Sequence, residues 1–369
     1  MQKSEPIIEA KPSERALDAR RWAGIVARYR EPNYARGIFE LAITALPLVF
    51  IWILMWATLQ TGHYWLCLLL AIPAAGFLVR LFMIQHDCGH TSFFRHRLAN
   101  DWVGRFIGVL TLTPYDGWAR SHAGHHATSG NLDQRGTGDV DTLTVREFQS
   151  LPRWRRLLYR LYRHPVVMFG IGPIYLFVLR HRLPLSGPGG WPVWLSTMGT
   201  NAAIAALIAI MMWLVGVGPF LLVQMPITLL AGLIGVWLFY VQHQFEDTFW
   251  AREGSWTFHE AALYGSSHYA LPPVLRWFTA NIGVHHVHHL CSRIPYYRLQ
   301  QVLRDHPQLA AIGRLTLWQS VKSVRMVLWD ERDRRLVVFR EMHAASKARG
   351  AGMLQNEIGR PFPSSTQTN

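Results

Sequence analysis

Cysteine and charged residues are both scarce in this sequence of 369 residues. Only three cysteines occur, and Cys67, Cys88 and Cys291 lie far apart with no CxxC pair. This spacing excludes a disulfide framework and a zinc site built on thiolates. Charged residues make up 16% of the chain and hydrophobic residues 50%. Such a composition excludes an ordinary water-soluble domain and indicates a membrane protein.

Four apolar runs are long enough to cross a bilayer, because about 20 residues at 1.5 Å per residue span its ~30 Å hydrocarbon core. The predicted spans are residues 38–60, 64–84, 193–215 and 219–241. Glu40 lies near the start of the first span. Arg80 lies near the end of the second, where its long side chain is expected to reach the membrane surface. Two shorter runs, 103–113 and 166–179, are interpreted as interfacial or partly buried helices.

The loops predict two hairpins and an orientation. Residues 61–63 and 216–218 link the spans of each pair, and neither link contains Lys or Arg. Eight basic residues precede residue 38, eleven lie in 85–165 and fifteen follow residue 241. Because Lys and Arg concentrate in cytoplasmic loops, both termini and the central connection are predicted to be cytoplasmic. A basic surface on anionic headgroups also accounts for the net charge of +14 without nucleic acid.

The chain outside the spans is expected to form two cytoplasmic regions. Residues 1–35 are predicted to be an N-terminal arm, with no pattern of a signal peptide. Residues 36–310 hold the membrane domain, and residues 311–369 are predicted to form a C-terminal helix and a flexible tail. A nucleic-acid-binding role is excluded, because the chain has no recognisable motif for it and has four predicted spans.

Eighteen histidines are present, and many of them gather in short clusters. The clusters are an HxxxH pair, two HxxHH motifs and a single histidine just after the fourth span: His86 and His90; His122, His125 and His126; His285, His288 and His289; and His243. Side chains three and four residues apart share one face of a helix. All four positions are predicted to be on the cytoplasmic side near membrane exits. One shared site is therefore expected.

A metal explains these clusters better than packing alone. Imidazoles held together without a metal would repel when protonated and would bury nitrogens without partners. Neutral imidazole suits iron, zinc or copper, and the residues alone do not choose among them. Nine nitrogens exceed the capacity of one ion, so two ions with open or water-filled positions are expected, as in a catalytic site. His286 falls outside the HxxHH spacing and is interpreted as a residue that supports the ligands.

Other residues receive simpler interpretations. The scattered histidines are interpreted as packing residues or headgroup contacts: His63, His96, His164, His181, His259, His268, His306 and His343. Acidic residues near the clusters are candidate acceptors for imidazole N–H groups: Asp87, Asp139, Asp141, Glu246 and Asp247. Aromatic residues near span ends are interpreted as an interfacial belt, with the lining of a substrate tunnel as the alternative: Trp118, Trp237, Phe239 and Tyr240.

The order HxxxH, HxxHH, HxxHH resembles the membrane-bound fatty-acyl desaturases, from about residue 36 to about residue 309. The segments 239–247 (FYVQHQFED), 283–290 (GVHHVHHL), 266–279 and 293–295 (RIP) resemble the acyl-lipid branch that makes ω-6 (Δ12) double bonds. The resemblance implies that residues 36–310 are a fatty acid desaturase domain. The implied fold is an all-α integral membrane protein: four transmembrane helices in two hairpins, with a cytoplasmic helical cap that holds a histidine-rich dimetal site.

The resemblance also implies the chemistry. Two non-haem Fe ions, with O2 as co-substrate and two electrons, would introduce a cis double bond into an acyl chain, with Δ12 favoured and Δ9 the second choice. The implied metal ligands are His86, His90, His122, His125, His126, His243, His285, His288 and His289. Of these, His243 is supported by its place rather than by a multi-histidine motif. No catalytic residue apart from the ligands, and no further cofactor-binding residue, is implied.

The partners follow from the same resemblance. The substrate is expected to be an acyl lipid in the bilayer, although CoA and carrier-protein esters stay open. Residues 1–37 are too few for a fused cytochrome b5-like domain, so a separate electron donor is expected. A ferredoxin with its reductase is favoured, because an acidic donor would dock on a basic surface. The expected location is a bacterial inner membrane, with the metal site on the cytoplasmic side.

Two other functions stay open. The same histidine pattern occurs in membrane hydroxylases, ketolases and desaturases that act on carotenoids, terpenoids or other lipids. A non-enzymatic, histidine-rich membrane protein that binds or moves metal is the alternative from another class. Polar residues that would mark an ion path are almost absent from the predicted spans, which argues against transport.

Overall fold

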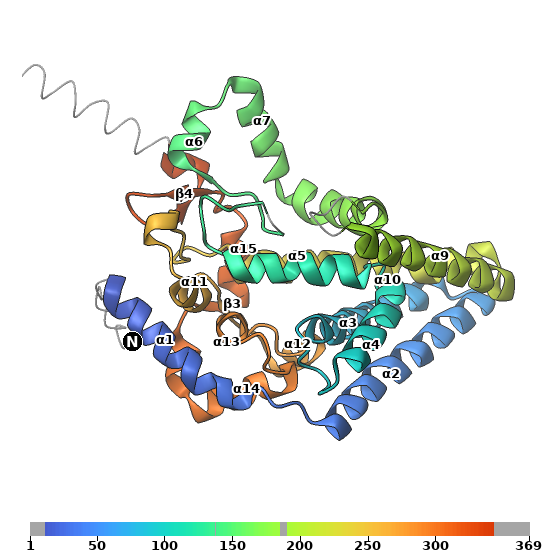
Figure 1. Ribbon diagram of the computed structural model, residues 1–369. Coiled ribbons are helices and arrows are strands. Elements are labelled where there is room, and N and C mark those ends of the chain that lie inside the picture. Colours follow the sequence, from blue (N-terminus) through green and yellow to red (C-terminus); the bar gives the residue numbers. More distant parts are fainter. Residues whose placement is uncertain (1–11, 137, 185–189, 343–369) are drawn as a thin grey trace, which may run out of the picture.

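The computed structural model describes residues 12–136, 138–184 and 190–342, and most of these residues are helical (Figure 1). The α-helices are α1 (Pro12–Val26), α2 (Tyr34–Gln60), α3 (Tyr64–Gly89), α4 (Arg97–Leu110), α5 (Tyr115–Thr128), α6 (Val145–Ser150), α7 (Arg153–Tyr162), α8 (Gly172–Ile174), α9 (Gly190–Val215), α10 (Val217–His243), α11 (Phe258–Tyr264), α12 (Pro273–Phe278), α13 (His285–Leu290), α14 (Tyr296–Asp305) and α15 (Leu317–Ser323). Short 3-10 helices are η1 (Ala27–Tyr29), η4 (Arg180–Arg182), η5 (Glu253–Ser255) and η6 (Pro307–Ala311). The π-helical turns η2 (Val166–Ile171) and η3 (Tyr175–Leu179) flank α8.

Four helices are long and apolar enough to cross a membrane, as predicted: α2, α3, α9 and α10. Each has 26 or 27 residues, and at 1.5 Å per residue such a helix is about 40 Å long. This length exceeds the ~30 Å hydrocarbon core, so the helices are long enough to extend past it. The last turns of α3 and α10 contain His86 and His243. The two helices therefore place these histidines at their ends.

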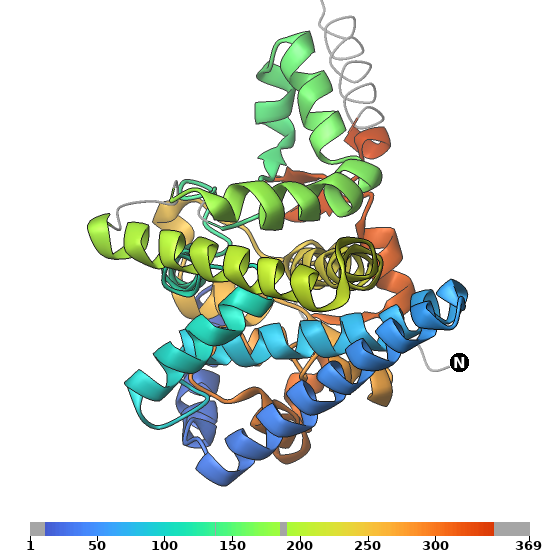
Figure 2. The same cartoon turned by 90° about the vertical axis from the view of Figure 1, so that its right-hand side faces the viewer.

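The four long helices form the two predicted hairpins. Residues 61–63 join α2 to α3, and Gly216 alone joins α9 to α10. Gly216 has a φ of 88°, a left-handed conformation that glycine adopts without the strain imposed by a side chain. Helix α3 packs against both α2 and α10, and Figure 2 shows α2 and α3 along their length. Helix α3 is the most buried of the four, and it joins the two hairpins through its contacts with α2 and α10.

Glu40 and Arg80 form an ion pair in the interior, which corrects the sequence-based interpretation of Arg80. Glu40 is 1% exposed and Arg80 is 2% exposed. Arg80 binds the Glu40 carboxylate and the carbonyl oxygen of Trp277, and its Nε lies 3.2 Å from the hydroxyl of Thr44. Arg80 therefore does not reach the membrane surface. An opposite charge on the neighbouring helix holds it inside the protein.

The remaining helices lie at the histidine-bearing ends of α3 and α10 or along their sides (Figure 1). Helix α4 takes the place of the predicted helix 103–113 and exposes Leu98, Trp102 and Phe106 on one side. The predicted helix 166–179 is present as a continuous helical run from η2 to η4. Helix α1, in the predicted N-terminal arm, packs against α11 and α13, and its Ala19 and Val26 are fully buried. Much of this arm is therefore part of the folded body.

Short strands complete the fold. Strand β1 (Leu143–Thr144) runs parallel to β4 (Leu328–Asp330), and β4 runs antiparallel to β5 (Arg335–Val337). Strand β2 (His268–Ala270) runs parallel to β3 (Arg314–Thr316). Where a C-terminal helix was predicted, the described residues contain α15 between β3 and β4. The predicted tail and His343 lie outside the described residues. The strands tie the segment after residue 310 to the loops around α5, α10 and α13.

Candidate metal centre

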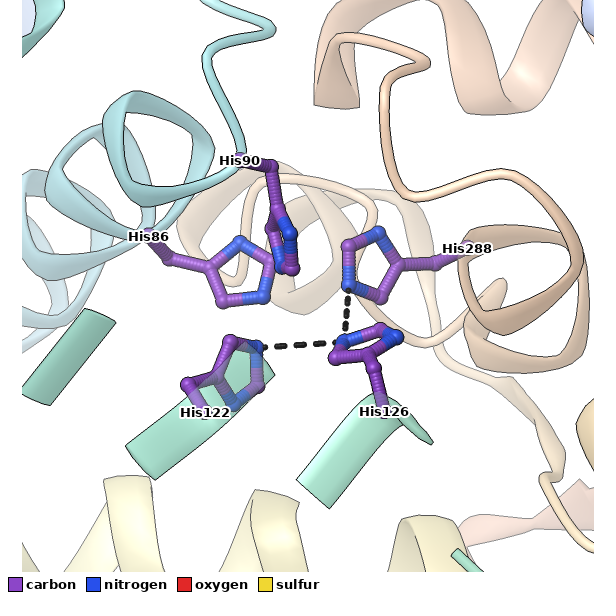
Figure 3. A group of neighbouring side chains, drawn as sticks. All are labelled: His86, His90, His122, His126 and His288. Atoms are coloured by element: carbon purple, nitrogen blue, oxygen red, sulfur yellow. Dashed lines mark hydrogen bonds between the residues drawn. The ribbon is translucent and has the colours of Figure 1, made fainter. Parts of the chain in front are cut away.

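All nine histidines that the sequence singled out lie together, and they form two groups. The first group is His86, His90, His122, His126 and His288, and the second is His125, His243, His285 and His289. Within each group, one nitrogen from every ring lies within 4.8 Å of the others. Figure 3 shows the rings of the first group pointing toward one another from three parts of the chain. The predicted single site is thus divided into two adjacent groups.

The helical spacing explains this division. Residues four apart lie one above the other on a helix, and a residue three apart is turned to one side of them. On α5, His122 and His126 enter the first group and His125 enters the second. On α13 the order is reversed: the second group holds the two histidines four apart, and the first group holds His288. Each HxxHH motif therefore contributes to both groups.

Hydrogen bonds fix which nitrogen faces the centre of the second group for two of its four rings, those of His125 and His243. The Nδ1 of His243 lies 3.2 Å from the carbonyl oxygen of Gly265, which can only accept. The Nδ1 of His125 binds the carboxylate of Asp139. With the proton on Nδ1, the Nε2 of each neutral ring carries a lone pair. These two Nε2 atoms lie 3.1 Å apart, so two lone pairs face each other across the group.

A metal ion removes this conflict. The Nε2 of His285 lies 3.0 Å from that of His243 and 3.1 Å from that of His289. Imidazole nitrogens about 2.1 Å from one transition-metal ion and at right angles to each other would be about 3.0 Å apart. In the first group, the Nε2 of His126 lies 3.2 Å from that of His122 and 3.1 Å from that of His288. Both groups therefore suit an ion bound by imidazoles.

The electrostatics of the site also favour neutral imidazoles. Burial holds the pKa of His285 and of His289 well below its ordinary value, and the neighbouring imidazoles lower it further. The same two causes lower the pKa of His126 and His288. Rings with such low pKa values keep a free lone pair at neutral pH. They can bind a cation without first losing a proton.

Two of the five candidate carboxylates contact the histidines. Asp139 binds His125, and an oxygen of Asp87 lies 3.2 Å from the Nδ1 of His86. In the described part of the chain, Asp141, Glu246 and Asp247 have no hydrogen bond to a histidine. The backbone N–H of Tyr296 donates to the other oxygen of Asp87 at 2.7 Å. The orientation of His86 therefore depends on α14 as well as on α3.

His286 lies outside both groups. Its Nε2 is 2.9 Å from the carbonyl oxygen of Leu309, and its ring lies beside that of His268. Burial lowers the pKa of His286 to about 3. The Nδ1 of His268 in turn lies 2.7 Å from the carbonyl oxygen of Ala310. His286 and His268 thus join α13 and β2 to η6, which agrees with a supporting role for His286.

The aromatic residues do not form one interfacial belt. Trp118 stacks on His122 with ring centroids 4.8 Å apart, and Phe239 lies 5.2 Å from the ring of His125. Tyr240 is buried, and its hydroxyl accepts a hydrogen bond from Arg163 at 3.1 Å. Trp237 donates to the hydroxyl of Tyr269. The belt interpretation is therefore wrong for Tyr240, and Trp118 and Phe239 lie against the histidine groups.

Sequence reasoning missed the contacts by which residues distant in the sequence orient the histidines. Gly265 and Tyr296 act through backbone groups, which carry no signal in the side-chain pattern. Tyr296 also donates from its hydroxyl to Glu40 at 3.1 Å, and Glu40 binds Arg80. For the pair of Glu40 and Arg80 the sequence did contain a signal, because the two opposite charges lie in neighbouring predicted spans. A buried pair explains them better than two separate surface contacts.

The fold and the histidine geometry together define a class of protein. It is a helical protein with four membrane-capable helices that gathers histidines from its helix ends and loops into a candidate dimetal site. Residues 60–320 match the family model described as fatty acid desaturase. The chain belongs to this family. Its members are oxidoreductases that introduce double bonds into fatty acids, so the chain is an enzyme of this kind.

Individual relatives agree with this assignment. A fatty acid desaturase of Bacillus subtilis is 45% identical over 315 residues, which are 85% of this chain and 89% of that protein. An sn-1 acyl-lipid omega-3 desaturase (ferredoxin) of Synechocystis is 31% identical over 60% of this chain and 62% of its own length. An sn-1 oleoyl-lipid 12-desaturase of Synechocystis is 27% identical over 64% of this chain and 67% of its own length. Acyl-lipid desaturases are therefore among the relatives.

Proposed function

We propose that this chain is a membrane acyl-lipid desaturase whose nine clustered histidines bind two iron ions. The observation that carries the proposal is the division of these histidines into two groups with ligand spacing. When bound, the two ions would supply the oxidising power of O2 for removing hydrogen from an unactivated methylene pair. The overall reaction converts a CH2–CH2 unit, O2, two electrons and two protons into a cis CH=CH unit and two waters.

The residues of this chain have three tasks in that reaction. The histidines bind the ions, and Asp139, Asp87 and the carbonyl of Gly265 hold three of the rings in place. Burial of the histidine groups keeps bulk water away from the oxidising centre. A methylene pair has no polar group to recognise, so its position must follow from the shape of an apolar path. We assign Trp118 and Phe239 to that path, because their rings lie against the two groups.

The substrate and donor are proposed from the relatives together with the charge of the chain. Several relatives are named for acyl-lipid or oleoyl-lipid substrates, and the name of the Synechocystis omega-3 desaturase includes ferredoxin. We assign a lipid-linked acyl chain as substrate and a ferredoxin, reduced by its reductase, as donor. The position of the double bond is proposed as Δ12 (ω-6), with Δ9 as the competing position. An acidic donor would dock faster at low ionic strength, so equal coupling rates in low and high salt would exclude this electrostatic docking.

The proposed architecture places the metal site and both termini in the cytoplasm of a bacterial inner membrane. Residues 36–310 would form the catalytic domain, between an N-terminal arm (1–35) and a C-terminal region (311–369). The family match to residues 60–320 supports the central part of this division. The basic residues outside the four long helices support the orientation.

Fatty-acid profiling tests the function directly. The full-length chain is expressed with a ferredoxin and its reductase in a bacterial host that lacks polyunsaturated lipids, and double bonds are located by mass spectrometry. A diene formed from the host's monoene is expected. A new monoene formed from saturated chains would move the position to Δ9. Hydroxylated or ketone products without any alkene would overturn desaturation in favour of a related oxygenase.

Matched variants test the metal assignment. His285→Ala and His288→Ala each remove one proposed ligand, from the second and first group respectively, and we expect loss of bound iron and of activity while membrane insertion is retained. The control is His96→Ala, which removes an exposed histidine outside both groups. Iron per folded protein, measured by elemental analysis, should stay at the wild-type value in the control. Equal iron in all three variants would refute the ligand assignment.

A further inference from the structure

Helix α7 carries an amphipathic pattern that the proposed function does not use. Its sequence is RWRRLLYRLY, with four arginines in ten residues. The apolar residues Trp154, Leu157, Leu158 and Leu161 recur at spacings of three and four, so they form one stripe along the helix. Arg153, Arg156 and Arg160 lie on one flank of the stripe, and Arg155 lies on the other. The stripe is thus bordered by positive charge on both sides.

The apolar stripe is not the face by which α7 is anchored to the protein. Trp154 and Leu157 are both 58% exposed, and Leu158 is 54% exposed. The anchor is Tyr159, whose buried hydroxyl donates to the carbonyl oxygen of Val327. Exposure of large apolar side chains to water is unfavourable. A stripe of four such side chains therefore indicates a contact surface. The anchored face and the exposed stripe are different sides of the same helix.

The position of α7 suits a membrane surface. Figures 1 and 2 both show α7 running across the direction of α9, one of the four membrane-capable helices. Helix α7 and the following run Val166–Arg182 meet at 58°, and they would make a fifth span only if the bent pair were counted as one. That run also exposes apolar side chains, Val166 and Ile171 among them. An element that crosses the direction of a spanning helix lies along the membrane plane, which is the orientation of an interfacial helix.

The charges and the local surface define the kind of partner. In the described part of the chain, Arg153, Arg155 and Arg156 form no ion pair with an acidic side chain, although Arg156 donates to the carbonyl oxygens of Leu151 and Gln149 and Arg155 lies over the ring of Trp154. An open groove of about 460 Å³ lies beside the stripe, and its lining includes Arg155, Leu158 and Tyr162, with Asp141 as its acidic residue. Guanidinium groups bind phosphates through several hydrogen bonds, whereas leucines favour acyl chains. A phospholipid presents both chemistries together.

We propose that α7 and its groove bind anionic phospholipid at the membrane surface. The stripe contacts the acyl chains, and the arginines bind headgroup phosphates. An acidic protein is the competing partner, because it would also match the arginines. The lipid is favoured because the run that follows α7 also exposes large apolar side chains. This binding requires neither bound metal nor desaturation, so it can be tested on catalytically inactive protein.

Site-specific photo-crosslinking tests the proposal. p-Benzoyl-phenylalanine replaces Leu158, which is exposed and lines the groove. The full-length protein is placed in nanodiscs with equal amounts of phosphatidylglycerol and phosphatidylcholine, and lipid adducts are counted by mass spectrometry. Each arginine near a charged surface contributes roughly a five-fold preference for anionic lipid. We therefore expect phosphatidylglycerol adducts to outnumber phosphatidylcholine adducts by about five-fold or more. The same probe at Leu161 gives an independent reading from the stripe.

Two charge variants make the result specific. Arg153→Gln/Arg155→Gln/Arg156→Gln should bring the adduct ratio to about one. The matched control, Arg20→Gln/Arg21→Gln/Arg28→Gln, removes the same charge from exposed positions on α1 and in η1, and should leave the ratio unchanged.

Three outcomes would overturn the proposal. The first is an absence of lipid adducts at both probe positions in protein that elutes as a folded species. The second is an equal fall in the ratio in both charge variants. The third is displacement of the lipid adducts by an added acidic ferredoxin, which would assign α7 to the protein partner.

Discussion

Substitutions at Glu40 and Arg80 should have strongly non-additive effects on the free energy of unfolding, because the two residues form a buried ion pair. Arg80 binds Glu40, a hydroxyl and a carbonyl, and its guanidinium carbon lies 4.1 Å from the ring centroid of Trp277. With Glu40→Gln these neutral partners remain, but the charge of Arg80 loses its buried counter-ion Glu40. Removing one member of a buried ion pair costs about 3–5 kcal/mol, because an uncompensated charge is left inside. We expect Glu40→Gln to lower the free energy of unfolding by an amount in that range.

Arg80→Leu should lower the free energy of unfolding by less than Glu40→Gln does. Glu40 keeps Arg36 at 2.7 Å, and Arg36 is 52% exposed, so water still reaches the remaining pair. Glu40 also keeps the hydrogen bond that it accepts from the hydroxyl of Tyr296. The double variant Glu40→Gln/Arg80→Leu removes both buried charges, and losing both members of a buried pair costs far less than leaving one charge unpaired. Its free energy of unfolding should therefore lie within about 2 kcal/mol of the wild-type value. This loss is far smaller than the sum of the losses in the two single variants.

Equilibrium unfolding in mixed micelles, followed by circular dichroism, provides the four free energies of this cycle. The control is Arg97→Leu, which removes an 83% exposed arginine paired with Asp101 and should cost less than about 1 kcal/mol. Strict additivity of the two single variants would refute the pairing. So would a loss in Glu40→Gln no larger than that of the exposed control.

Further predictions concern the histidine groups and the folded cap. Asp139→Asn keeps the size of the side chain but weakens the acceptor that orients His125, so iron affinity should fall about 10- to 100-fold in a chelator competition, while unchanged affinity would exclude this role. In Gly265→Ala a new Cβ would lie 2.5 Å from a backbone oxygen, so the carbonyl that binds His243 should shift and iron per folded protein should fall; a wild-type iron content would contradict this. Burial raises the pKa of Glu147, but hydrogen bonds from Arg135 and from the backbone N–H of Thr144 lower it from 4.5 to about 2. Its carboxylate therefore stabilises the fold above about pH 4.5, and the difference between wild type and Glu147→Gln should shrink as pH falls from 5 to 2 in a series of melting curves; a difference independent of pH would refute the charge effect.

The sequence alone determined the main elements and the histidines. Four apolar runs of about 20 residues predict membrane-capable helices, because a bilayer requires that length and low polarity. Eight of the nine histidines could be chosen because helical periodicity places residues three and four apart on one side, and His243 could be chosen by its place after the fourth span. The structure brings all nine together, including His243, which stood outside any multi-histidine motif. Local patterns were sufficient for these features because their physical cause is also local.

Tertiary structure alone decided how the histidines divide and what holds them. The His125–His243 and His126–His288 contacts join segments 118 and 162 residues apart, and no local pattern fixes such distances. The carbonyl of Gly265 and the N–H of Tyr296 orient rings through the backbone, whose direction depends on the whole path of the chain. Arg80 was expected at the surface and lies inside, because its partner Glu40 comes from the neighbouring helix. Long-range packing sets these contacts, since each depends on two segments arriving at one place.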